Sequence, residues 1–172
     1  MIEPDSLIDN PEPQDLGQLE MSNLRSVREQ LQEVEYGYSY ARRVVQGRLD
    51  TVLGVLEHKN QGDQGSDPIL EMPETLGNRI KGPGLPRPTR GLEPPEWADD
   101  LLTELNDAVS LEDLSNLADM DTDVLADLAE TISGIERQLS ETRSGLHMRI
   151  ERVQAELISR YRQGAGVEDL LT

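Results

Sequence analysis

The sequence of 172 residues has no cysteine and no phenylalanine, two histidines, and 3% aromatic residues. Without cysteine it can form no disulfide and no thiolate zinc site, and two histidines are too few for a histidine-based metal cage. No apolar run approaches the roughly 20 residues of a membrane-spanning helix, and the acidic first residues are unlike a signal peptide. We therefore expect a soluble, cytoplasmic protein without a metal centre and without membrane association.

Basic residues are also scarce, with 16 Lys and Arg against 34 Asp and Glu, for a formal net charge of −18. Such a negative surface repels the phosphates of DNA, so we expect no direct DNA binding. It favours a basic protein partner, such as one that itself binds DNA. The sequence offers no activated nucleophile, no metal cage and no phosphate-binding glycine loop, so we do not expect an enzyme.

Proline divides the chain, because three prolines lie in the first 13 residues, seven lie between Pro68 and Pro95, and the stretches between and after contain none. Proline-free stretches allow long helices, whereas proline- and glycine-rich stretches favour turns and extended chain. The predicted segments are a disordered acidic tail (1–18), a first long helix (19–59), a Pro/Gly-rich linker (60–93), short helices (94–120), a second long helix (121–163) and a tail (164–172).

Each long helix carries apolar residues at alternating spacings of three and four, which is the signature of a coiled coil. In the first helix the pattern includes one charged residue and comprises Leu24, Val27, Leu31, Val34, Tyr38, Ala41, Val45, Arg48, Val52 and Val55. In the second it comprises Leu125, Leu128, Ile132, Ile135, Leu139, Thr142 and Leu146, then shifts by one residue to Ile150, Val153, Leu157 and Tyr161. Helices this long need a partner for their apolar stripe.

The predicted fold is therefore all-α. It is an antiparallel coiled-coil helical hairpin with short accessory helices and a disordered acidic tail and linker. The linker permits a hairpin within one chain or an exchange of helices between two chains. Among the accessory helices, we expect Trp97 to belong to the core or to staple its helix to the hairpin, and Ser110 with Asp113 to cap a short segment.

A polar stripe lies beside each apolar pattern. The first stripe has spacings of four, three, four and four and consists of Glu35, Ser39, Arg42, Gln46 and Asp50. The second repeats these spacings with Glu136, Ser140, Arg143, His147 and Glu151. At 100° per residue, the five side chains of a stripe fall within about 80° of one another, on one helix face.

The residue types suit a guanine nucleotide. Arginine can fork onto O6 and N7 of guanine, and a carboxylate can accept from the ring and amino N–H groups. Serine and glutamine can contact phosphate and sugar oxygens. Two copies of such a set suggest a ligand with repeated guanines and phosphates.

Two other interpretations fit the same residues. Glu, Arg and Gln at these spacings also form ordinary intrahelical ion pairs on exposed faces, so the chain could be an acidic coiled-coil adaptor or scaffold without a small-molecule ligand. It could also be an acidic mimic of DNA that blocks a basic protein.

The motif Glu35-x3-Ser39-x2-Arg42-x3-Gln46-x3-Asp50 resembles the repeated cyclic-di-GMP-binding motif of the RsiG family. That family comprises actinobacterial anti-sigma factors of WhiG, the sigma factor of the sporulation and flagellar class. The first copy matches at all five fixed positions, and the second departs at His147 and Glu151. The resemblance implies a coiled-coil hairpin with one motif copy on each helix.

The resemblance further implies that two intercalated cyclic-di-GMP molecules bind across the motifs. The liganded hairpin would then hold a WhiG-type sigma factor away from RNA polymerase. It assigns nucleotide contacts to Glu35, Arg42, Gln46, Asp50, Glu136, Arg143, His147 and Glu151. Ser39 and Ser140 are small enough to let the ligand approach the helices.

Overall fold

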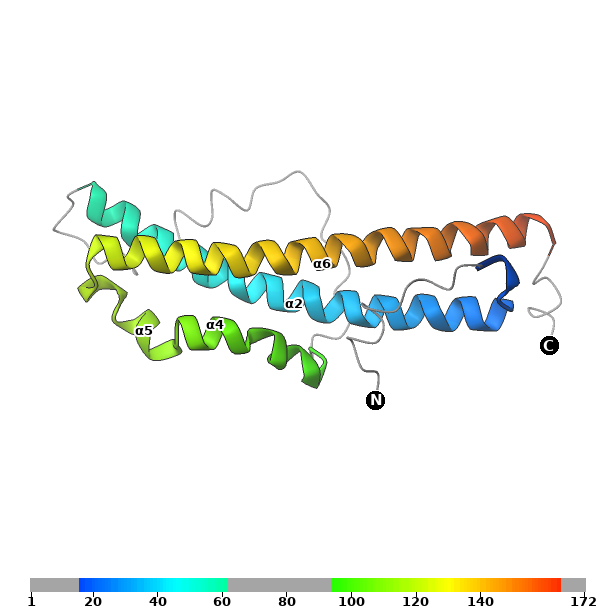
Figure 1. Cartoon of the computed structure of the whole chain (residues 1–172), viewed down its shortest axis with the longest axis horizontal. Helices are drawn as coiled ribbons and strands as arrows, with labels where there is room; N and C mark the ends of the chain where they lie inside the picture. Colours follow the sequence, from blue (N-terminus) through cyan, green and yellow to red (C-terminus); the bar gives the residue numbers. More distant parts are fainter. Residues whose placement is uncertain (1–15, 62–93, 165–172) are drawn as a thin grey trace. The chain divides into compact units, whose positions relative to one another are not determined.

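The computed structural model describes residues 16–61 and 94–164, and these residues form helices and turns without a strand. The elements, in chain order, are η1 (Leu16–Gln18), α2 (Met21–Asn60), η2 (Glu96–Leu102), α4 (Thr103–Ala108), α5 (Leu111–Ser115), η3 (Leu117–Asp119) and α6 (Thr122–Arg162) (Figure 1). The two predicted long helices are confirmed, and their ends lie within two residues of the predicted ones. The predictions for residues 1–15, 62–93 and 165–172 lie outside the described residues.

The long helices α2 and α6 pack against each other as a helical hairpin, as predicted. The chain divides into two compact units, one formed by Met1–Ser39 with Leu139–Thr172 and the other by Tyr40–Gln138. In the first unit, Nη1 of Arg28 donates a hydrogen bond to Oε1 of Gln154 over 3.3 Å. In the second unit, Nζ of Lys59 donates to the backbone oxygen of Met120. Met120 lies two residues before α6 begins, so within each unit the start of one long helix lies near the end of the other, which is the antiparallel arrangement.

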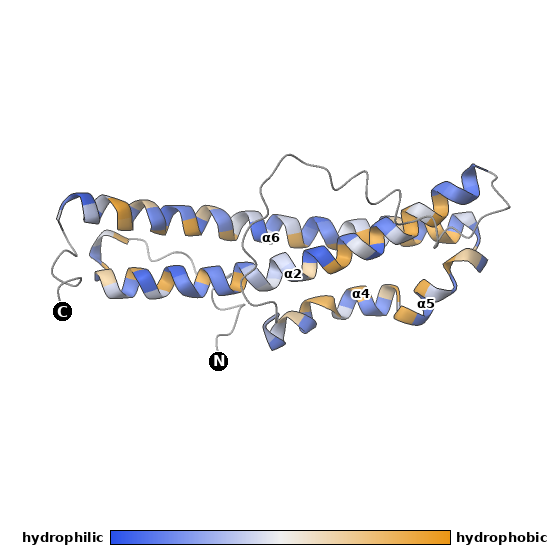
Figure 2. Ribbon diagram, turned by 180° about the vertical axis from the view of Figure 1, so that it is seen from behind, coloured by the Kyte–Doolittle hydropathy of each residue, from blue (hydrophilic) through white to orange (hydrophobic). Residues whose placement is uncertain are grey.

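The apolar pattern forms the packed surface of both helices. In α2 the buried members are Leu24, Leu31, Val34, Tyr38, Ala41, Val45, Val52 and Val55, and in α6 they are Leu125, Ile132, Ile135, Leu139, Leu146, Val153 and Leu157. Figure 2 shows hydrophobic and hydrophilic residues interleaved along both helices, as expected when one face is apolar. Complete burial of one such aliphatic side chain contributes about 1.5–3 kcal/mol.

Tyr161 departs from the prediction. It was expected to continue the apolar pattern, yet it is 43% exposed. Its hydroxyl oxygen accepts hydrogen bonds from Nη2 and Nε of Arg25, at 2.9 and 3.2 Å, and the guanidinium carbon of Arg25 lies 5.8 Å from the ring centroid. Partial exposure lets the tyrosine hydroxyl keep its hydrogen bonds and lets a cation lie over the ring, and both interactions are favourable.

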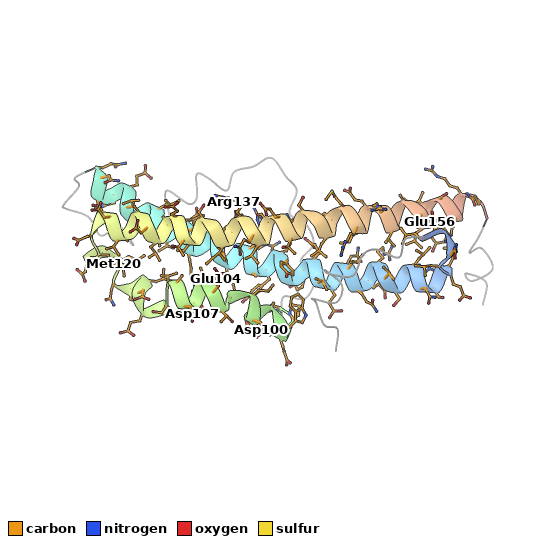
Figure 3. The ribbon with its side chains drawn as sticks, viewed as in Figure 1. Asp100, Glu104, Asp107, Met120, Arg137 and Glu156 are labelled. Carbon is orange, nitrogen blue, oxygen red and sulfur yellow. The ribbon has the colours of Figure 1, made fainter. Side chains whose placement is uncertain are left out.

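Arg48 is the charged residue within the apolar pattern of α2, and the structure explains its presence. It is half-buried, and its Nη1 donates a 2.8 Å hydrogen bond to the backbone oxygen of Val109, the C-cap residue that follows α4. The carbonyls at a helix C-terminus lack intrahelical partners and carry partial negative charge, so a cation stabilises them. Arg48 thus links α2 to the accessory segment, which comprises residues 94–120. Lys59 makes a second link at Met120, which is labelled in Figure 3.

The accessory segment packs through a narrow apolar face. Its buried residues are Ala98, Leu102, Leu105, Val109 and Leu117. Trp97 is half-buried, so it is not part of the core, one of the two roles predicted for it. The predicted cap of α5 is confirmed: the Asp113 backbone N–H donates to Oγ of Ser110, and the Ser110 backbone N–H donates to the Asp113 carboxylate. These reciprocal bonds make a capping box.

Residues 16–18 were predicted to belong to the disordered tail, but they form η1. Nη2 of Arg160 donates to the backbone oxygen of Leu16 over 2.6 Å, and Nη1 donates to that of Leu19. One guanidinium fork thereby satisfies two carbonyls of this turn. The prediction was wrong here because the stabilising side chain lies at the far end of the sequence.

Candidate functional site

The two polar stripes lie on the long helices beside the apolar pattern, and most of their members are half-buried. A charged side chain that loses part of its contact with water is stabilised by a polar partner. The printed sequence shows which residues share a helix face, whereas the structure shows which of them meet.

The first network lies within the unit formed by Met1–Ser39 and Leu139–Thr172. Oε1 of Glu35 accepts hydrogen bonds from Oγ of Ser39 at 2.6 Å and from Nε of Arg143 at 3.0 Å. Nε of Arg143 also donates to Oγ of Ser39 over 2.8 Å. Nε2 of His147 lies 3.1 Å from the same Glu35 oxygen. A single carboxylate on α2 therefore gathers two nitrogen-bearing side chains of α6.

The second network lies within the unit Tyr40–Gln138. Oε1 of Glu136 accepts hydrogen bonds from Nε of Arg42 at 2.9 Å and from Nε2 of Gln46 at 3.2 Å. Here the carboxylate lies on α6, and both donors lie on α2. The side chains of Arg42 and Glu136 are 30% and 22% exposed, so the pair is accessible to solvent without being fully hydrated.

The two networks use the same motif positions. In each, the glutamate that opens one motif copy accepts a hydrogen bond from the arginine of the other copy: Glu35 from Arg143, and Glu136 from Arg42. The next motif position also lies at this glutamate, because Gln46 donates to Glu136 and Nε2 of His147 lies 3.1 Å from Glu35. Sequence analysis predicted two equivalent stripes. It did not predict this crossed pairing, because the pairing depends on the register between the helices.

The remaining predicted site residues hold different positions. Asp50 and Ser140 are half-buried on α2 and α6, and each has a polar partner. Glu151 is exposed on α6 and joins neither network within residues 16–61 and 94–164. Seven of the ten predicted residues are thus brought together in two clusters, and Glu151 is not.

The geometry leaves part of Arg143 available for a further acceptor. Its side chain is 31% exposed, and in the described part of the chain both of its hydrogen bonds come from Nε. The opposite edge of the guanidinium carries its two terminal nitrogens. Such an edge can fork onto two acceptors of a planar ligand.

No metal site accompanies these networks. Across residues 16–61 and 94–164, no group of three or more histidine and carboxylate side chains could hold a metal ion. Among the same residues, no helix combines the length and the apolar character that crossing a bilayer requires.

Comparison with known protein families gives a match to the first part of the chain. The family described as RsiG-like matches residues 10–76, which contain the whole of α2 and the first motif copy. This match confirms the resemblance to the RsiG family. The RsiG-like family suggests an anti-sigma factor role and a sigma-factor partner. The family is also linked to nucleotide regulation.

The matched residues end before α6, so the second motif copy lies outside them. In the crossed pairing, residues of the second copy contact residues of the first. A search among curated proteins found no match.

Proposed function

We propose that this chain is an anti-sigma factor that binds a cyclic-di-GMP dimer on its two motif copies. In the liganded form it sequesters a WhiG-type sigma factor from RNA polymerase and represses that factor's regulon. It acts as a binding protein in the cytoplasm and not as an enzyme.

The observation that carries the proposal is the crossed pairing of the two motif copies. Arg42 and Arg143 are each oriented by a carboxylate of the opposite copy through Nε. Arginines held in this way are preorganised, so less side-chain entropy is lost when a guanine binds. Two equivalent arginine centres fit a ligand that presents guanine more than once.

The charge distribution supports the second half of the proposal. Residues 94–136 contain thirteen Asp and Glu and no Lys, Arg or His. Exposed members include Asp100, Glu104 and Asp107 on η2 and α4 (Figure 3). A sigma factor carries a basic surface that grips promoter DNA, and an acidic surface complements it electrostatically.

Nucleotide binding is also easier to reconcile with the net charge of −18 when a basic partner is present. A strongly acidic protein repels the ligand's phosphates, and a basic sigma factor closing over them removes part of that repulsion. By linkage, a partner that tightens nucleotide binding is itself bound more tightly when the nucleotide is present.

The test is a calorimetric titration of cyclic-di-GMP into the full chain and its Arg42→Ala and Arg143→Ala variants, each alone and mixed with a WhiG-type sigma factor. A hydrogen bond to a charged group is worth about 1.5–3 kcal/mol, so each variant is expected to bind about ten- to a hundredfold more weakly. Arg43→Ala is the matched control, because Arg43 is exposed and adjacent to Arg42. Equal binding by all four proteins would contradict the proposed site.

The alternative is an acidic coiled-coil adaptor without a small-molecule ligand. The same geometry fits it, because Glu–Arg pairs that form without a ligand can contribute to the stability of the fold alone. It predicts that cyclic-di-GMP produces no binding heat in any of these proteins. It also predicts that Arg42→Ala lowers the unfolding temperature while leaving partner binding unchanged.

A further inference from the structure

The two networks differ at the fourth motif position, where one has Gln46 and the other has His147. Nε2 of Gln46 donates to Oε1 of Glu136 over 3.2 Å, and Nε2 of His147 lies 3.1 Å from Oε1 of Glu35. His147 therefore occupies in the second motif copy the place that Gln46 occupies in the first. The imidazole is 45% exposed, so a ligand or a proton can reach it.

A neutral imidazole can copy the amide here. With its hydrogen on Nε2, His147 donates to Glu35 and presents Nδ1 as an acceptor, much as Gln46 donates through its nitrogen and presents its oxygen. Protonation changes this equivalence, because both ring nitrogens then donate and the ring carries a positive charge. Glutamine has no such second state, whereas histidine changes charge in the physiological range.

The charged groups nearest to His147 along the chain and across the helix pair belong to both long helices. Glu35 on α2 contacts it, and Arg28 lies two turns earlier on the same helix. On α6, Arg143 lies one turn before it and Glu151 one turn after it. One more negative group close to the ring would favour the charged state.

Resting on the nucleotide site proposed above, we infer that binding of the anionic nucleotide is coupled to protonation of His147, whose Nδ1–H then donates to a phosphate oxygen of the ligand. The proton comes from the solvent, and Nε2–H keeps its contact with Glu35. Because the first motif copy has an amide at this position, the network at Glu35 is proton-linked and the network at Glu136 is not. Affinity consequently rises as the pH falls from 8 to 6, by at most about tenfold per pH unit for one proton.

The experiment is a calorimetric titration of cyclic-di-GMP into the full chain at pH 6, 7 and 8. At pH 7 it is repeated in two buffers of different ionisation enthalpy, which gives the number of protons taken up. The wild-type chain is expected to take up a fraction of one proton per chain and to bind more tightly at pH 6 than at pH 8. His147→Gln is expected to take up none and to bind with the same affinity at pH 6 and pH 8.

Two further variants sharpen the comparison. Gln46→His places an imidazole at the equivalent position of the other copy, and it is expected to increase the proton uptake. His58→Gln removes the histidine in the last turn of α2, away from both networks, and is expected to leave the uptake unchanged. Equal pH dependence in the wild-type chain and His147→Gln would overturn the proton coupling.

The outcomes separate this inference from the proposed function. If neither the wild-type chain nor any variant binds cyclic-di-GMP at any pH, alone or mixed with a WhiG-type sigma factor, the nucleotide site itself fails. If all of them bind with the same pH dependence, the site stands and the proton coupling fails. Should His147→Gln bind too weakly to titrate, nitrogen NMR of the wild-type histidines at pH 7 decides. Conversion of the His147 ring to its doubly protonated form on adding nucleotide supports the coupling, and unchanged ring nitrogens refute it.

Discussion

Arg143 of α6 donates a hydrogen bond from Nε to Oε1 of Glu35 on α2 over 3.0 Å, although both side chains belong to the polar stripes and not to the apolar pattern. The equivalent bond in the other unit joins Arg42 to Glu136 at 2.9 Å. Each motif copy therefore depends on the other for the orientation of its arginine. This reciprocity makes each network a property of the paired helices and not of either helix alone.

Exchanging the charges of Arg42 and Glu136 tests the crossed pair directly. Arg42→Glu alone puts two carboxylates together and is expected to destabilise the fold. Adding Glu136→Arg restores the pair, because the Gln46 amide can either donate or accept. For a partly exposed pair we expect a coupling of about 0.5–1 kcal/mol in a double-mutant cycle followed by denaturant unfolding.

The exchanged protein also separates stability from binding. Its arginine now lies on α6 at the motif position where the proposed site needs a carboxylate. Cyclic-di-GMP binding is therefore expected to stay weak even though the fold recovers. Normal nucleotide binding by the exchanged protein would show that the motif positions do not matter. A double variant no more stable than Arg42→Glu would show that the pair makes no contribution.

Arg48 is predicted to hold the end of α4. Arg48→Met keeps an apolar stem in the helix pattern but removes the donor to the Val109 carbonyl. We expect a loss of about 1 kcal/mol and faster amide exchange in α4, with α6 unchanged. Hydrogen exchange measured by mass spectrometry makes the comparison, and Arg43→Met serves as the exposed control. Unchanged exchange in α4 would mean that its apolar face alone anchors it.

The cap of α5 gives a prediction for acid pH. Hydrogen bonds from the Ser110 hydroxyl and then from its backbone N–H lower the pKa of Asp113 below its ordinary value of 3.8. A lowered pKa in the folded state stabilises the fold above that ordinary value, and the contribution is lost as the pH falls through the lowered one.

Thermal unfolding between pH 2 and 5 should therefore show a smaller acid-induced loss of stability in Ser110→Ala than in the wild-type chain. Asp113→Asn should reduce the same acid dependence, since it removes the titrating group. Identical acid profiles for all three proteins would argue that the cap does not form in solution.

Much of the fold could be predicted because the two long helices repeat apolar residues at spacings of three and four over most of their length. The exceptions have long-range causes. Arg48 interrupts the pattern because it serves Val109, and Tyr161 leaves the core because Arg25 meets its hydroxyl and ring. The turn at Leu16 depends on Arg160. Each partner lies more than sixty residues away, where local pattern carries no information.

The candidate site could be predicted in part for the same reason. The spacing of each motif copy placed its side chains on one helix face, and the duplication indicated two related half-sites. The spacing could not indicate that Glu35 meets Arg143 and His147, because that contact depends on how α2 and α6 are aligned. Glu151 keeps the motif spacing, yet it is exposed and joins neither network in the described residues.

The most direct test of the central claim measures the affinity of this chain for a WhiG-type sigma factor with and without cyclic-di-GMP, by analytical ultracentrifugation of the two purified proteins. The account predicts a one-to-one complex that forms tightly with the nucleotide and dissociates when the nucleotide is removed. Arg42→Ala and Arg143→Ala should form it poorly even with nucleotide present, while Arg43→Ala should behave like the wild-type chain. A complex of equal affinity with and without nucleotide would contradict the account, as would the absence of any complex under both conditions.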